Sequence, residues 1–449
     1  MQFFESYIER LGSDVVPPPE IILGSDGLET VARRISSLPA GTGVWIISDE
    51  NTDAAFPLRA ALSSLASSTT PASERRVAAC SPLPGTPRVV PDDFLVERIT
   101  CDVIAAKAGL VVAIGGGTIS DIAKRVSYLA GVPNWCVATA PSVDAYTSAK
   151  SAIRVDGYHN GIPATPSSLV VCDVDVMAAA PQVLFLSGVG DLTAKYFAYL
   201  EWFIASLVTG EPYSEREASF ALDSARRAVA AFQSLPSGAR PDAAAARALG
   251  DAVLTSGLAM RAAGNSRPAA AAEHTIAHFW EMAGVVGVES YDYHGLLVAI
   301  AAATVFPFYV GFFDELRRGM PDPDRDVVEP YDHLSSLDRL VAPYRAKMIA
   351  ETGGPVPIEE RRRRVARFLA SAESIIERVE TLLPELEAAI GALGAAGFPL
   401  TPASAGISAE AVTTSLRYVP YLRDRFGMFD LILYLGWEDR LGLPSPAGR

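Results

Sequence analysis

The chain has 449 residues, of which 49% are hydrophobic and 20% charged, which predicts two or more globular domains and excludes a largely disordered chain. Its net charge of -14 argues against a nucleic-acid-binding surface or an anionic-membrane-binding surface. The four cysteines form no Cys-x-x-Cys motif, and the first ten residues carry Glu5 and Glu9 without an apolar core. We therefore expect a cytoplasmic protein with reduced cysteines.

The first 172 residues alternate between strand and helix patterns. Short apolar runs predict strands at residues 20–24, 44–48, 76–81, 110–114, 135–140 and 170–172. Helical spacing predicts helices at residues 27–38, 58–67, 92–108 and 119–130. Such alternation is typical of a parallel sheet with helices on both faces.

After Pro181 the sequence becomes rich in Ala and Leu with helical spacing almost to its end. We predict an α/β nucleotide-binding domain over residues 1–178 and an all-α metal- and substrate-binding domain over residues 179–449.

Residues 296–313 approach the length of a membrane span, but they contain Pro307 and Gly311, which favours a buried core helix. The charge run at residues 359–364 indicates a solvated helix face, and the charged, Pro-rich residues 317–330 indicate an insertion or a linker.

Three glycines, Gly115 to Gly117, separate a buried strand from the next helix. Glycine lets the backbone approach a phosphate closely, and a helix start offers unpaired N–H groups. Thr118 and Asp121 have the spacing of a capping box, so a plain turn with a good cap is the alternative. The triplet differs from the Gly-x-Gly-x-x-Gly fingerprint.

Polar residues close two strands of the predicted sheet. Asp49 follows residues 44–48, where a carboxylate can accept a hydrogen bond from a ribose hydroxyl, and Thr139 and Ser142 end a later strand. Together with the glycines they indicate a dinucleotide cofactor. Asp49 favours NAD over NADP, because a carboxylate repels a 2′-phosphate.

Three of the five histidines fall between residues 274 and 294. His274 and His278 are four residues apart and share one helix face, and His294 follows a glycine-containing break. Asp191 lies in a glycine-flanked segment where we expect the first turn of a helix. Asp191, His274 and His294 form a carboxylate and imidazole set that suits Zn²⁺ or a neighbouring divalent ion. A capping Asp191 and core histidines are the alternatives.

Several motifs resemble those of the sn-glycerol-1-phosphate dehydrogenases, in the superfamily they share with iron-containing alcohol dehydrogenases, glycerol dehydrogenases and dehydroquinate synthases. They are Gly-Gly-Gly-Thr-Ile-Ser-Asp-Ile-Ala-Lys (115–124), Thr-Ala-Pro-Ser-Val-Asp-Ala-Tyr-Thr-Ser (139–148), Gly-Val-Gly-Asp-Leu (188–192), Asn-Ser-Arg-Pro-Ala (265–269), Glu-His-Thr-Ile-Ala-His (273–278) and His-Gly (294–295). Ala145, Ala271 and Ala272 depart from the usual pattern. The resemblance implies a dehydroquinate synthase-like fold.

The resemblance also implies roles for individual residues. It implies Asp191, His274 and His294 as metal ligands, and Asp144 and His278, with Asp191, on the substrate. Asp144 also suits a loop-closing Asx turn. Around a nicotinamide cofactor we expect Asp49, Gly115, Gly116, Gly117, Thr118, Ile119, Ser120, Asp121, Thr139, Ala140, Pro141, Ser142 and Ser148.

We predict a metal-dependent NAD(P)-linked oxidoreductase that interconverts dihydroxyacetone phosphate and sn-glycerol 1-phosphate, with Zn, Ni or Fe as the metal. His278 would hold the substrate or relay its proton. Arg267 or Lys195 would meet the phosphate, and for Arg267 the alternative is a surface side chain that caps the preceding helix. We expect a homo-oligomer with a small-molecule substrate and neither a nucleic-acid nor a membrane partner. The alternatives are a polyol or alcohol dehydrogenase, a dehydroquinate-synthase-like cyclase, and a catalytically silent binding protein.

Overall fold

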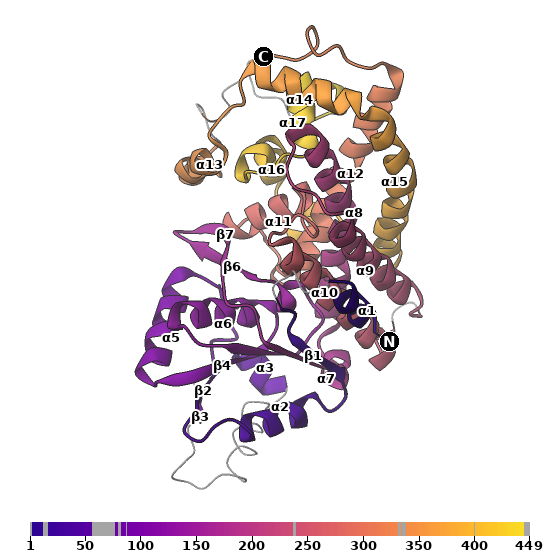
Figure 1. Ribbon diagram of the computed structural model, residues 1–449. Helices are drawn as coiled ribbons and strands as arrows, with labels where there is room; N and C mark the ends of the chain where they lie inside the picture. Colours follow the sequence, from indigo (N-terminus) through magenta and orange to yellow (C-terminus); the bar gives the residue numbers. More distant parts are fainter. Residues whose placement is uncertain are drawn as a thin grey trace. The chain divides into compact units, whose positions relative to one another are not determined.

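The computed structural model describes residues 2–11, 17–55, 77–79, 82–86, 88–236, 239–330, 334, 338–398 and 400–443. The chain divides into two compact units. Unit 1 consists of residues 1–192 and 223–265, and unit 2 consists of residues 193–222 and 266–449. Helices α8 (Gln182–Thr209) and α9 (Glu215–Gln233) contribute residues to both units (Figure 1). The domain boundary at residue 178 stays a prediction, and the helix predicted at residues 58–67 lies outside the described residues.

Unit 1 contains a six-stranded sheet in the order β1-β8-β5-β4-β2-β3, and every neighbouring pair in it is parallel. Its strands are β1 (Glu20–Gly24), β2 (Gly43–Ile47), β3 (Val77–Ala79), β4 (Ala108–Gly115), β5 (Asn134–Ala138) and β8 (Leu169–Asp173). The parallel sheet predicted from the alternation is confirmed. Because the strands are parallel, the carboxyl ends of β2, β4 and β5 lie on one edge.

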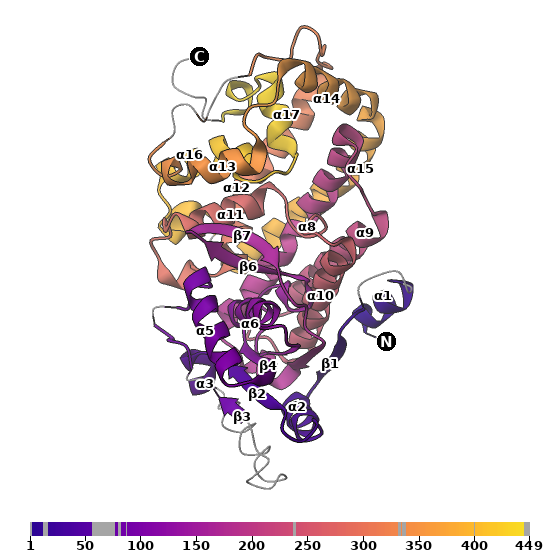
Figure 2. The ribbon, with the colours of Figure 1, turned by 60° about the vertical axis from the view of Figure 1, so that its left-hand side comes forward.

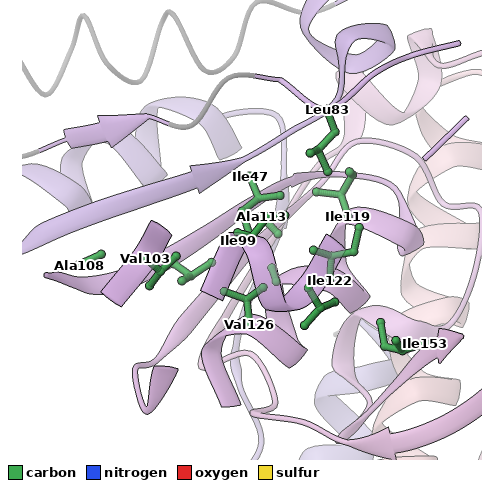
Figure 3. Close-up of a cluster of buried hydrophobic side chains, with 13 residues drawn as sticks. Ile47, Leu83, Ile99, Val103, Ala108, Ala113, Ile119, Ile122, Val126 and Ile153 are labelled. Atoms are coloured by element: carbon green, nitrogen blue, oxygen red, sulfur yellow. The ribbon is translucent and has the colours of Figure 1, made fainter. Parts of the chain in front are cut away.

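Helices cover both faces of this sheet. Successive side chains of β4 alternate: Leu110 and Val112 pack with α2 (Gly27–Ser36), while Val111 and Ala113 pack with α5 (Asp93–Ala105) and α6 (Gly117–Ala130). Figure 3 shows the second cluster, in which Ile119, Ile122 and Val126 of α6 point toward the sheet. Figure 2 shows α5 and α6 side by side.

The remaining elements of unit 1 are shorter or lie outside the sheet. They are α1 (Phe3–Leu11), α3 (Glu50–Ala55), α7 (Val174–Ala179), α10 (Ala243–Ala263), the 3-10 helix η1 (Ala145–Thr147) and the strands β6 (Lys150–Val155) and β7 (Tyr158–Pro163). The antiparallel pair β6 and β7 is absent from the sequence-based prediction. Its turn residues, Asp156 and Gly157, have positive φ angles of 51° and 75°, and an Asp-Gly pair between apolar runs is a hairpin signal.

Unit 2 is helical in its described residues, as predicted for the C-terminal part of the chain. Its helices are α11 (Ala272–Met282), α12 (His294–Arg318), α13 (Arg345–Thr352), α14 (Ile358–Ala370), α15 (Ala372–Ala395), α16 (Ala409–Leu422) and α17 (Met428–Leu435). Short 3-10 helices are η2 (Glu289–Tyr291), η3 (Ala342–Tyr344), η4 (Pro402–Ala405) and η5 (Asp439–Leu441).

Helix α12 is long and apolar enough to cross a membrane by length and composition, but 61% of its apolar window is buried inside the protein. It packs against α11 and α15. The prediction of a core helix at residues 296–313 is therefore confirmed. In the charge run at the start of α14 only Glu359 and Arg363 are exposed, and Arg361 is buried, with its guanidinium over the ring of Tyr434.

Candidate active site

The glycine triplet lies where β4 ends and α6 begins, at the carboxyl edge of the sheet in unit 1. The N-cap of α6 is Gly116, which has no side chain that could accept a hydrogen bond from the first-turn N–H groups. A Cβ on Gly116 would have Ser142 Oγ, 3.8 Å away, as its nearest neighbour. The helix start therefore presents N–H groups beside open space, which suits an anion such as a pyrophosphate.

The prediction of a capping box formed by Thr118 and Asp121 is wrong. The helix begins two residues earlier than that box requires, so Asp121 faces inward and forms an ion pair with Lys124, at 2.8 Å between Oδ1 and Nζ. The buried Lys124 ammonium also donates to the Ser148 hydroxyl and to the carbonyls of Ala145 and Lys150. Ser148, expected at the cofactor, thus takes part in anchoring η1 and β6 to α6. Thr118 is exposed, and Ile119 and Ser120 are buried.

The residues that follow β5 lie beside the glycine triplet. The backbone N–H of Thr139 donates to the Gly115 carbonyl, and β5 pairs with β4 as far as Ala138. The Tyr146 hydroxyl donates to the Ala140 carbonyl, and the Ser187 hydroxyl donates to the Ser142 carbonyl. These bonds fix the segment 139–142 along the same edge of the sheet.

Asp49 closes β2 at this edge. Its carboxylate accepts hydrogen bonds from the backbone N–H and the hydroxyl of Thr52, at 2.8 and 3.0 Å, so it caps helix α3. These bonds use one lone pair on each oxygen, and a carboxylate oxygen has capacity for another. The ribose contact of Asp49 stays a prediction.

Asp191 lies in the middle of α8, so the prediction of a helix first turn at that position is wrong. The nearby Gly188 allows α8 to pack closely against the Pro141 backbone, because a Cβ at this position would stand 1.8 Å from the Pro141 carbonyl oxygen. The Asp191 carboxylate is buried and accepts a hydrogen bond from the backbone N–H of Asp144. The Asp144 carboxylate accepts from the Ser256 hydroxyl at 2.7 Å, which gives it a role other than an Asx turn.

The three histidines predicted to gather do so within unit 2. His274 and His278 share one face of α11, with ring centroids 6.1 Å apart. His294, the first residue of α12, stacks on His278 with centroids 4.5 Å apart and lies 5.3 Å from His274. The local spacing of the sequence and the return of the chain after residue 282 together produce a cluster of three imidazoles.

Two glutamates that sequence reasoning missed contact these imidazoles. Glu281 lies 2.9 Å from Nδ1 of His278 and 3.1 Å from Nδ1 of His294, and Glu273 lies 3.2 Å from Nδ1 of His274. The i, i+3 spacing of His278 and Glu281 was the available signal. A carboxylate accepts hydrogen bonds only, so each pair favours the imidazole tautomer with its proton on Nδ1 and a lone pair on Nε2.

The basic residues expected at a phosphate are buried in unit 2. Arg267 forms an ion pair with Glu211 at 2.8 Å and donates to the Phe426 carbonyl, so it is not a surface cap of the preceding helix. Pro268 lies in a turn, because α11 begins at Ala272. Lys195 donates to the Ala269 carbonyl.

Further ionisable groups are buried in the same unit. Burial, together with the nearby Arg267 guanidinium, lowers the pKa of Arg425 to about 9. Burial raises the pKa of Glu201 to about 7, although the Tyr309 hydroxyl and the Met428 N–H donate to its carboxylate. The region behind the histidine cluster is therefore a buried polar network.

The sequence of the chain is similar to sequences of known dehydrogenases. A family model described as iron-containing alcohol dehydrogenase matches residues 23–181. A glycerol-1-phosphate dehydrogenase (NAD(P)+) from Hyperthermus butylicus is 31% identical over 278 residues, which cover 60% of this chain and 77% of that protein. One from Geobacillus thermodenitrificans is 31% identical over 55% of this chain, and the match spans only 62% of that protein.

The fold is also that of solved structures in this superfamily. A probable glycerol dehydrogenase from Sinorhizobium meliloti superposes with a TM-score of 0.58 at 17% identity, covering 95% of this chain and 98% of that one. On the sequence match to most of the Hyperthermus protein, the chain belongs to the glycerol-1-phosphate dehydrogenase family, within the iron-containing alcohol dehydrogenases.

Proposed function

We propose that the protein is a metal-dependent, NAD(P)-linked oxidoreductase that interconverts dihydroxyacetone phosphate and sn-glycerol 1-phosphate. The observation that carries the proposal is the cluster of His274, His278 and His294, in which a glutamate faces Nδ1 of every ring. Imidazoles that bind a metal commonly donate their second N–H to a carboxylate in this way. The names of the related proteins supply the substrate pair.

The chain's residues fit a divalent metal. His274 and His294 would bind it through Nε2, and Asp191 would add a carboxylate oxygen, which gives three protein ligands of the kind that catalytic sites use. When bound, the metal would polarise the C2 oxygen of the substrate and stabilise its alkoxide character.

The chain's residues also fit a nicotinamide dinucleotide. The N–H groups at the start of α6 would hold the pyrophosphate, and Gly116 leaves room for it. The segment 139–142 and Asp49 would flank it at the same sheet edge. When bound, the nicotinamide would exchange a hydride with C2. Asp49 supports a preference for NAD.

Side chains around the reacting carbon would hold the substrate and move its proton. Asp144, fixed by Ser256, would accept a hydrogen bond from a substrate hydroxyl. His278, with its Nδ1 on Glu281, would hold or relay the proton of the C2 oxygen through Nε2.

Initial rates with dihydroxyacetone phosphate and each reduced cofactor test this function. We expect net oxidation of NADH that depends on the substrate, and a loss of the activity upon exhaustive chelation. Net cofactor consumption separates a dehydrogenase from a cyclase, which regenerates its cofactor in each cycle. Full activity in the chelated protein would contradict the proposal.

One observation favours a second candidate, a dehydrogenase of unphosphorylated polyols. Arg267 and Lys195, the basic residues predicted to meet a phosphate, bond to a carboxylate and to backbone carbonyls inside unit 2. A phosphate in a cleft needs donors of its own. A higher kcat/KM for dihydroxyacetone or glycerol than for the phosphorylated pair would support the polyol dehydrogenase.

A further inference from the structure

Glu281 is shared by two imidazoles. It lies in the last turn of α11, one turn beyond His278, and its Oε2 accepts from Nδ1 of that ring at 2.9 Å. Its Oε1 accepts from Nδ1 of His294, at the first position of α12, at 3.1 Å. The two rings stack with an angle of 14° between their planes.

The two bonds fix the same tautomer in both rings. An ionised carboxylate has no proton to donate, so both Nδ1 atoms must carry the hydrogen and both Nε2 atoms must carry a lone pair. His274 obtains the same tautomer from a different carboxylate, Glu273. One glutamate thus controls His278 and His294 together, while His274 is controlled separately.

We propose that Glu281 is a positioning residue that sets the tautomer of a metal ligand, His294, and of the substrate-side base, His278, so that both present an Nε2 lone pair. This inference rests on the proposed function for the roles of the two histidines. The Glu281 contacts themselves lie within unit 2.

A purely structural role is the competing explanation, because Glu281 also ties the end of α11 to the start of α12. The two explanations differ in what they predict for the rings. If Glu281 only joins the helices, its removal lowers thermal stability without changing the tautomers. If it positions the rings, both tautomers change, and metal affinity changes with them.

The decisive measurement is two-bond ¹H–¹⁵N correlation NMR of ¹⁵N-histidine-labelled, metal-free protein at alkaline pH, where imidazoles are neutral. The chain has five histidines, so single His→Ala variants can assign the signals. In the wild type we expect His278 and His294 to be protonated at Nδ1. In Glu281→Ala both should shift toward the Nε2–H form, while His274 keeps its tautomer.

The second measurement is Co²⁺ affinity by competition with a chromophoric chelator. Loss of an outer partner of a ligand costs roughly tenfold to a hundredfold in metal affinity, so Glu281→Ala should weaken Co²⁺ binding by about that factor. His278→Ala should retain Co²⁺ binding. Glu289→Gln, at an exposed carboxylate in η2, is the matched control and should leave both measurements unchanged.

Glu281→Gln serves as the second variant if Glu281→Ala fails to fold. Its amide oxygen can accept from one ring while its NH₂ group cannot accept from the other, so one of the two tautomers should change. Unchanged tautomers, or unchanged Co²⁺ affinity in a variant whose tautomers shift, would overturn the inference. If the tautomers follow Glu281 but the wild type binds no divalent metal, the proposed ligand set fails and the tautomer control by Glu281 stands.

Discussion

The backbone N–H of Asp144 donates a hydrogen bond to Oδ2 of Asp191, with 3.0 Å between the two atoms. This bond joins a proposed substrate residue to a proposed metal ligand within unit 1. The Asp144 side chain is fixed in turn by Ser256. The position of one carboxylate therefore depends on the segment that carries the other.

Removal of the Ser256 hydroxyl tests this arrangement. Ser256→Ala leaves the buried Asp144 carboxylate without that donor, so its orientation toward a substrate hydroxyl should loosen. We expect kcat/KM for the substrate to fall by the equivalent of roughly 1.5–3 kcal/mol, the scale of a hydrogen bond to a charged group. Ser374→Ala, at an exposed serine of α15, is the matched control, and an equal effect there would refute the assignment.

The metal ligands are tested by comparing two histidines on one helix face. His274→Ala should lose bound metal and turnover together, because it removes a proposed ligand. His278→Ala should keep the metal and lose turnover, because it removes the proposed base. Metal content by elemental analysis and initial rates distinguish the two. Loss of metal from neither variant, or from both, would contradict the assignment.

Two glycines should respond in opposite ways to an added side chain. Gly116→Val should leave folding largely unchanged and raise the cofactor KM, because the new side chain enters the open space at the start of α6. Gly188→Ala should destabilise unit 1 by about 3 kcal/mol or more, because its Cβ would meet the Pro141 carbonyl oxygen. Denaturant unfolding and cofactor titration of both variants check this. An unchanged cofactor KM in Gly116→Val would make the triplet a simple turn.

Lys124 is expected to be essential for the stability of unit 1. Lys124→Met leaves the buried Asp121 carboxylate without its ion-pair partner, which costs about 3–5 kcal/mol. The double variant Lys124→Met with Asp121→Asn should recover part of that loss, because the unpaired charge is gone. Urea unfolding of the three proteins measures the coupling. Additive losses would show that the pair does not act as a unit.

Stability should fall as the pH rises through neutrality. Burial raises the pKa of Glu201 from 4.5 to about 7 and that of Asp430 from 3.8 to about 6. Folding therefore favours the protonated forms, so this contribution is complete below about pH 4 and is lost as the pH passes 6 to 7. For Glu201 it amounts to about 3 kcal/mol.

Glu201→Gln tests the origin of this pH dependence. The amide oxygen can replace Oε1, which accepts both the Tyr309 hydroxyl and the Met428 N–H, so the local bonds should persist. The free energy of unfolding, measured by denaturant between pH 5 and pH 8, should fall less steeply than in the wild type. An identical slope would place the titrating group elsewhere.

Elements whose pattern is local could be predicted from the sequence alone. Alternating apolar runs gave the parallel strands, a glycine triplet marked the start of α6, and the four-residue spacing of His274 and His278 placed both on one face of α11. These features depend on the periods of strand and helix, which neighbouring residues set. The Asp-Gly turn of the β6–β7 hairpin carried the same kind of signal.

The hydrogen-bond partner of each buried polar group, by contrast, depends on the packing of segments that are far apart in the sequence. Gly188 looks like a turn residue in sequence, yet it lies inside helix α8, where the absence of a side chain leaves room for the Pro141 carbonyl. Ser256 donates to Asp144 across 112 residues of sequence, and Arg267 pairs with Glu211, which lies 56 residues earlier in the connection between α8 and α9. Buried polar groups must find hydrogen-bond partners, and packing of remote segments determines which groups are near enough to serve.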